Sequence, residues 1–192
     1  MNQLLEWLSG GDLRSDGMAN EVSDFVLHDP QLICDLYEGL SVSDDVIRGR
    51  TADALEKISR SRPDLLIDDL HELTQIAMND SVAMVRWHIA MILGYLSIYE
   101  EKINEIANTL LHLLQDESVF VRSWAIVSLC IVGRKYQGKR EEIVNHITPL
   151  QHDDSIAIKS KVRKAIDLLV NETVPFPKGW VKSRHLETIS KI

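Results

Sequence analysis

The feature that most constrains the fold of this chain is a seven-residue motif that recurs every 36 to 38 residues. Each full copy has an aspartate, an aliphatic residue five positions later and a basic residue at the sixth, as in Asp80–Arg86, Asp116–Arg122 and Asp153–Lys159. A partial copy ends at Ile47 and Arg48, with Val42 in the aspartate position. Repetition at this period predicts an array of stacked supersecondary units rather than one closed core.

Each copy of the motif opens a predicted amphipathic helix. In the second copy the apolar residues fall on one helical stripe, formed by Val85, Ile89, Ile92, Leu93 and Leu96. Another apolar helical pattern precedes each copy, around residues 32, 70, 106 and 143. The sequence therefore predicts an all-α chain built from four helix pairs, each consisting of a first and a second helix.

Helix pairs with an aspartate at the turn and Val-Arg at the start of the second helix resemble the HEAT repeat, a unit of armadillo-type solenoids. The resemblance covers about residues 30–171 and implies a right-handed superhelix of about four repeats with caps at both ends. Residues 1–29 are interpreted as N-terminal capping helices. Residues 172–192 leave the repeat as a basic tail that contains prolines and Trp180. Two arrangements are open for this tail: a cap over the last repeat, or a strap across the array.

The recurring charged residues form two ladders. The basic ladder is Arg48, Arg86, Arg122 and Lys159, and the acidic ladder is Asp80, Asp116 and Asp153. In HEAT-like arrays such residues typically tie neighbouring turns together through charge-assisted hydrogen bonds. The resemblance therefore implies a structural role for both ladders rather than a binding strip.

The second helices of the two central repeats carry apolar residues where such helices usually carry polar ones. Large exposed apolar groups mark interaction sites, and Trp and Met are enriched at interfaces. We therefore predict a partner-binding surface on the second helices, or else coverage of this surface by the tail. The candidate residues are Trp87, Met91, Ile98, Trp124 and Val127.

The charge distribution argues against nucleic acid as the main partner. The formal net charge is −8, and residues 1–133 hold 9 Lys and Arg against 22 Asp and Glu, whereas residues 134–192 hold 12 against 7. An acidic surface repels phosphate backbones. The opposite charges of the two ends would also permit self-association. The alternative function is that of HEAT-like alkylpurine DNA glycosylases, whose aromatic cleft Trp87, Trp124 and His88 could mimic, although no distinctive motif of that family is present.

The sequence shows no constellation typical of catalysis. The pair His71-Glu72 resembles the iron-binding pairs of HEAT-like deoxyhypusine hydroxylases, but the equivalent positions around Cys34, Asn108 and Asn145 lack the ligands for a shared site. We therefore expect no metal, no cofactor and no enzymatic activity. Two unpaired cysteines, no signal-peptide pattern and no apolar run of membrane-spanning length favour a cytoplasmic protein without membrane contact.

Overall fold

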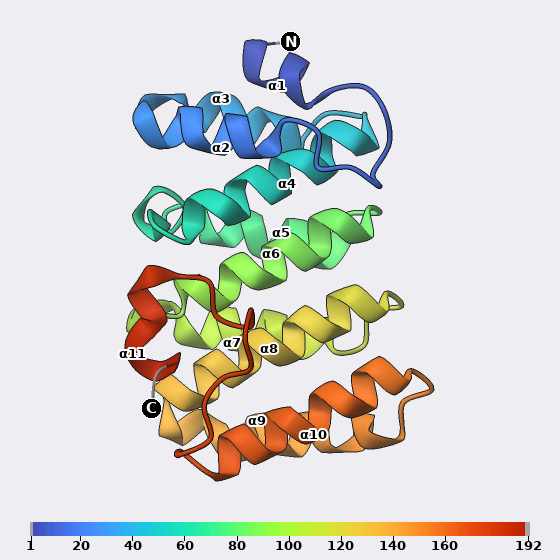
Figure 1. Cartoon of the computed structure of the whole chain (residues 1–192), viewed down its shortest axis with the longest axis vertical. Coiled ribbons are helices and arrows are strands. Elements are labelled where there is room, and N and C mark those ends of the chain that lie inside the picture. Colours follow the sequence, from blue (N-terminus) through green and yellow to red (C-terminus); the bar gives the residue numbers. More distant parts are fainter. Residues whose placement is uncertain (1, 191–192) are drawn as a thin grey trace.

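The computed structural model describes residues 2–190 as a stack of helix pairs joined by short turns (Figure 1). The first helices of the pairs are α1 (Gln3–Leu8), α3 (Ile33–Tyr37), α5 (Leu70–Asn79), α7 (Ile103–Leu113) and α9 (Arg140–Ile147). The second helices are α2 (Ala19–His28), α4 (Asp45–Ser59), α6 (Ala83–Leu96), α8 (Val119–Lys135) and α10 (Ile156–Val170). A short helix, α11 (Glu187–Ser190), ends the described chain.

The aspartates of the motif shape the turns that precede the second helices. Asp80 Oδ1 accepts a hydrogen bond from the amide of Val82 at 2.7 Å, and Asp116 and Asp153 make the equivalent bond two residues on. Asp44 caps α4 by accepting from the amides of Val46 and Ile47. A side-chain acceptor at this point satisfies amides that the first helical turn leaves without partners. The repeated aspartate therefore lies in the turn three residues before α6, α8 and α10, whereas α4 is capped directly by Asp44.

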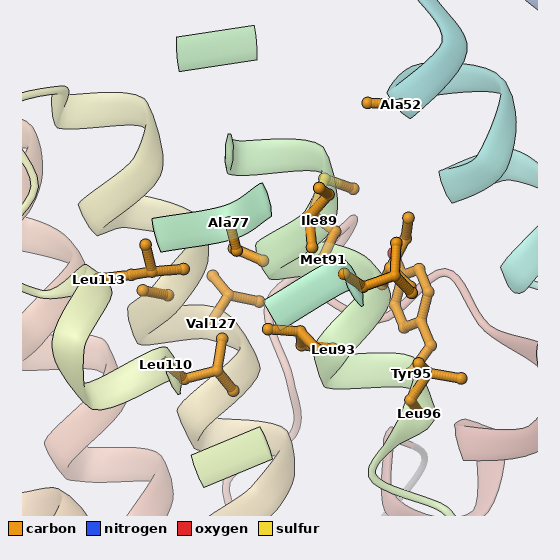
Figure 2. Close-up of a cluster of buried hydrophobic side chains, with 14 of the residues drawn as sticks. Ala52, Ala77, Ile89, Met91, Leu93, Tyr95, Leu96, Leu110, Leu113 and Val127 are labelled. Carbon is orange, nitrogen blue, oxygen red and sulfur yellow. The ribbon is translucent and has the colours of Figure 1, made fainter. Parts of the chain in front are cut away.

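The helices form two layers, with the core between them. Each second helix packs on the second helices before and after it, so α2, α4, α6, α8 and α10 make one continuous layer, and α3, α5, α7 and α9 lie behind it (Figure 1). We call the outer surface of α4, α6, α8 and α10, turned away from the first helices, the second-helix face. Figure 2 shows the centre of the core, where Leu93 of α6 lies near Leu110 of α7 and Val127 of α8.

The C-terminal tail runs back over the array, which is the second of the two arrangements that the sequence left open. From the end of α10 it crosses the second-helix face, and the amide of Arg184 donates to the carbonyl of Arg60 at the end of α4 (Figure 1). The outer ends of α10 remain uncovered, because Ile156 and Val170 are exposed. Lys191, part of the predicted basic set of the tail, lies outside the described residues.

Candidate binding surface on the second helices

The charged ladders join consecutive repeats. Arg86 donates through Nε and Nη2 to both oxygens of Asp116, at 2.7 and 3.0 Å, and through Nη1 to the carbonyl of Asp80 at 2.7 Å. Arg48 donates one bond, through Nε, to Asp80 and another, through Nη1, to the carbonyl of Val42. Arg122 donates one bond, through Nη2, to Asp153 and another, through Nη1, to the carbonyl of Asp116. Each arginine thus bonds the turn of its own repeat and the aspartate of the next, with charge-assisted bonds that are largely shielded from water.

The basic ladder ends at Lys159. No further repeat follows α10 in the described chain, and no ion pair of Lys159 is present among residues 2–190. Lys159 instead lines a shallow surface depression with His152, Ile156 and Arg163. The ladder therefore occupies the edge of the array as a structural device, and its last member has no following aspartate to contact.

Two of the predicted partner-binding residues, Met91 and Val127, do not lie at the surface. Met91 is 3% exposed and Val127 is 1% exposed, so neither side chain is exposed as expected, and their contact with a partner stays a prediction. Met91 shares a helical face with His88 and Tyr95, and both contact α4: His88 lies 3.4 Å from Asp53, and the Tyr95 hydroxyl donates to Glu56 at 3.0 Å. Because α6 is flanked by α4 and α8, the apolar stripe turns towards a neighbouring helix rather than to solvent.

Val127 is buried in the core, and its neighbours on α8 contact the tail. Trp124, one turn earlier, is half-buried and contacts the tail, because Lys182 Nζ lies 5.3 Å from the centre of its ring. Arg134, two turns later, also binds the tail. Ile98, the remaining candidate, is half-buried against the core just beyond the end of α6.

An aromatic pair remains accessible on the second-helix face. Phe120 at the start of α8 is 62% exposed, and its ring centre lies 5.1 Å from that of Trp87 on α6, which is half-buried. Trp87 Nε1 donates to His88 Nε2 at 3.2 Å, while His88 Nδ1 contacts the carbonyl of Met84. This pattern requires a neutral imidazole with its proton on Nδ1, in agreement with burial, which lowers the pKa of His88 below its usual value.

A buried acidic cluster lies on α4 beside the aromatic pair. Asp53 pairs with Lys57 at 2.5 Å, and Glu56 pairs with Arg60 and accepts from Tyr95. Burial, followed by the charge of Glu56, raises the pKa of the Tyr95 hydroxyl, which therefore stays protonated and donates. The tail brings Lys182 close to this cluster: desolvation lowers the pKa of Lys182, and the carboxylates of Glu56 and Asp53 oppose that shift.

The root of the tail is held by Arg134, which is 7% exposed at the end of α8. Its guanidinium donates to the carbonyls of Leu168, Glu172 and Val174 at 2.8 to 3.1 Å. It also lies 5.6 Å from the centre of the Phe176 ring. The far end is held where the amide of Arg184 donates to the carbonyl of Arg60 and the His185 ring bonds the carbonyl of Ser61.

Between these ends, the tail places Trp180 against the second-helix face. Lys161 of α10 lies between two indoles, 5.2 Å from the ring centre of Trp124 and 5.5 Å from that of Trp180. Desolvation lowers the pKa of Lys161. A cation over the face of an aromatic ring is attracted by the quadrupole of the ring, and the attraction is stronger when the cation is partly desolvated. Two lysines and two tryptophans therefore form a mixed stack that joins the tail to α8 and α10.

The described residues offer no sign of a metal site or a membrane span. Within residues 2–190, no three His, Cys, Asp or Glu side chains are grouped so that they could hold a metal ion. The His71 side chain is exposed, and its Nδ1 lies 3.4 Å from a carboxylate oxygen of Glu105. None of the described helices combines the length and the apolar character needed to cross a bilayer.

Comparisons with known proteins identify the fold. No protein-family model matches the chain, and the search of curated proteins finds no match. A designed armadillo repeat protein in complex with the peptide (KR)4 aligns with a TM-score of 0.64 and 14% identity over 86% of this chain and 80% of that chain. Another designed armadillo repeat protein aligns with a TM-score of 0.43 and 13% identity over 87% of this chain and 98% of that chain. The first alignment shows that this chain has an armadillo/HEAT-like helical repeat fold.

The residues that organise this surface have no distinctive pattern in the sequence. Asp53 and Glu56 look like ordinary solvent-facing polar residues of a second helix, yet both are buried. Arg134 stands in the last turn of α8, where a basic residue is common. Its partners are main-chain carbonyls 34 to 40 residues further along the chain, which no side-chain pattern announces.

Proposed function

We propose that this protein is a non-enzymatic interaction scaffold, located in the cytoplasm, that binds a protein or peptide partner on its second-helix face. The observation that carries the proposal is the exposed aromatic pair of Phe120 and Trp87 in the middle of the array. An accessible aromatic centre with charged residues around it is typical of a protein interface. The two cysteines, Cys34 and Cys130, are both free thiols, which favours a reducing compartment.

The surroundings of the aromatic pair support a peptide-like partner. Phe120 lies one helical turn before Trp124, and Trp124 already contacts an irregular segment, the tail. The structural neighbour with the peptide (KR)4 is a precedent for a repeat array of this kind that holds a peptide, although its low identity speaks for the fold alone.

The nucleic-acid alternative has less support. Arg134 is buried and donates to main-chain carbonyls, and Lys182 stacks on Trp124, so these cations are engaged within the protein. A strong salt-dependent affinity for duplex DNA needs several lysines and arginines free to reach phosphates.

The proposal is tested with Phe120→Asp, which places a charge at the centre of the exposed pair and disturbs little of the core. Proteins cross-linked to wild type in native extract should be lost from this variant and retained by Val170→Asp, a control at an exposed position on α10. The two variants should melt within about 2 °C of wild type, as surface substitutions usually do. The same cross-linked proteins on all three chains would overturn the proposal.

A further inference from the structure

The middle of the tail contacts the body through side chains alone. In residues 175–183 the buried side chains are Phe176, Trp180 and Ser183, separated by exposed residues such as Lys178. The Trp180 amide donates locally to the carbonyl of Pro177, and among the described residues no hydrogen bond joins the backbone of residues 175–183 to the helices. This stretch therefore sits on the second-helix face as a bound peptide would, with its ends anchored and its centre exchangeable.

The contacts of this stretch define a chemical preference. Trp180 packs on Lys161, whose other side faces Trp124, and Lys182 lies over Trp124 and near Asp53 and Glu56. An aromatic side chain thus occupies one position, and a cation two residues later lies over an indole face, on the side of the array where Asp53 and Glu56 pair with Lys57 and Arg60. We therefore expect this surface to bind preferentially an extended segment in which lysine stands two positions after an aromatic residue.

The tail is an imperfect ligand for its own site. Ser183 is 2% exposed, and its hydroxyl is buried without a hydrogen-bond partner. A buried polar group that has lost water and gained no partner weakens the bound state. A segment with a small apolar residue at this position would bind the same surface more tightly than the tail does.

We propose that the second-helix face binds an external protein segment with this aromatic-x-lysine pattern, and that the segment displaces residues 175–183 of the tail. The proposal rests on the proposed function, since it names the kind of partner and the event that admits it. The tail then acts as an internal competitor, so affinity for the partner depends on how tightly the tail is held. A segment without the aromatic-x-lysine pattern would not displace the tail and would therefore not bind.

The experiment measures binding of a fluorescein-labelled synthetic peptide of residues 172–190 to the full chain by fluorescence anisotropy. Trp180→Ala weakens the internal competitor and should bind the peptide about ten-fold more tightly than wild type. Ser183→Ala removes the unpaired hydroxyl, tightens the tail and should bind the peptide several-fold more weakly than wild type. Lys178→Ala, an exposed tail position, is the matched control and should equal wild type.

The opposite signs of the two variants separate competition from general destabilisation. Ser183→Ala keeps the test independent of any loss of folding in Trp180→Ala. A peptide that itself carries Ser183→Ala should bind the Trp180→Ala chain more tightly than the parent peptide, and a peptide with Trp180→Ala and Lys182→Ala should not bind.

Equal affinities for all four chains would overturn the proposal. So would concentration-dependent dimers of the wild-type chain that the peptide does not dissociate, because the face would then be filled by the tail of a second copy. Either result would leave the proposed scaffold function to be judged by the Phe120→Asp experiment, which does not use the peptide.

Discussion

The N-terminal cap and the C-terminal tail, which we call the strap where it crosses the second-helix face, are each held to the array by a buried arginine. Each arginine donates hydrogen bonds to main-chain carbonyls. Arg50, 4% exposed in α4, donates to carbonyls of the loop after α1, those of Leu8, Ser9, Gly10, Asp12 and Ser15. Arg134, 7% exposed, does the same for the start of the tail. A planar guanidinium with five donors can gather several carbonyls of an irregular segment that has no helix or sheet of its own.

What the arginines anchor differs. The cap contributes a whole helix to the core, because Leu4, Leu5 and Leu8 of α1 are buried in the same cluster as the helices of the first repeat. The tail contributes Phe176, Trp180 and Leu186 to that cluster, two of them from an irregular segment. The strap adds only a few buried side chains, and its middle makes no backbone hydrogen bonds to the helices in the described chain. The same kind of arginine anchor therefore holds a permanent cover at the N-terminal end and a separable cover over the second-helix face at the C-terminal end.

Arg50→Met should have the largest effect, because it leaves several carbonyls without donors inside a cover that is continuous with the core. We expect a loss of about 3 kcal/mol in the free energy of unfolding, measured by urea denaturation followed by circular dichroism. Arg14→Met, at an exposed position of the same loop, is the control and should change stability by less than about 0.5 kcal/mol. A loss limited to the first helix would break the comparison, since the cap would then be as separable as the strap.

Arg134→Met should release the strap and leave the array folded. We expect a loss of about 1–2 kcal/mol in global stability, together with much faster amide hydrogen exchange in residues 172–186 and unchanged exchange in α4 to α7. Hydrogen exchange read by mass spectrometry checks both parts. Uniformly faster exchange along the whole chain would show that the strap belongs to the cooperative core.

Mild acid should produce the smallest effect, on the strap side of the molecule. Burial lowers the pKa of His88 against the opposing charges of Asp53 and Glu56, so the unfolded chain binds a proton more readily than the folded one. Stability is then fully present above the unfolded pKa of about 6.5 and falls as the pH drops below it, by at most about 1.4 kcal/mol per pH unit. Melting temperatures between pH 7.5 and 5.5 measure this slope.

His88→Gln is the matched variant for the acid experiment, because glutamine does not titrate in this range. Its slope between pH 7.5 and 5.5 should be shallower than that of wild type. Parallel slopes would mean that other groups cause the acid sensitivity and that the neutral imidazole between Trp87 and Asp53 has no part in it.

The sequence predicted the repeat architecture well and the surface less well. The all-helical armadillo/HEAT-like fold is confirmed, because the period and phase of the motif reflect contacts that recur in every repeat. The same phase brings Arg86 next to Asp116. The apolar stripe of α6 identified residues that lack solvent partners, but a single helix cannot show whether its stripe meets solvent or the next helix. Met91 was misplaced for this reason.

Contacts that occur only once in the molecule could not be predicted from the repeat pattern. The strap, Arg50 and Arg134 each depend on an irregular segment whose path has no periodic signal. The sequence did leave open that the tail would cover the central residues. It could not choose that arrangement, because the decisive bonds run to main-chain carbonyls that every residue possesses.

The path of the strap also has a mechanical consequence. In a linear array each repeat contacts only its neighbours, so the curvature of the whole is the sum of small independent rotations at the joints. The strap connects the end of α8, through Arg134, to the end of α4, through Arg60. It therefore spans the two joints between these helices, namely the contacts of α4 with α6 and of α6 with α8. While it is in place, rotations at those joints must compensate one another. When the strap is displaced, the repeats can rotate independently at each joint. A segment that binds in its place would therefore also set the curvature of the array.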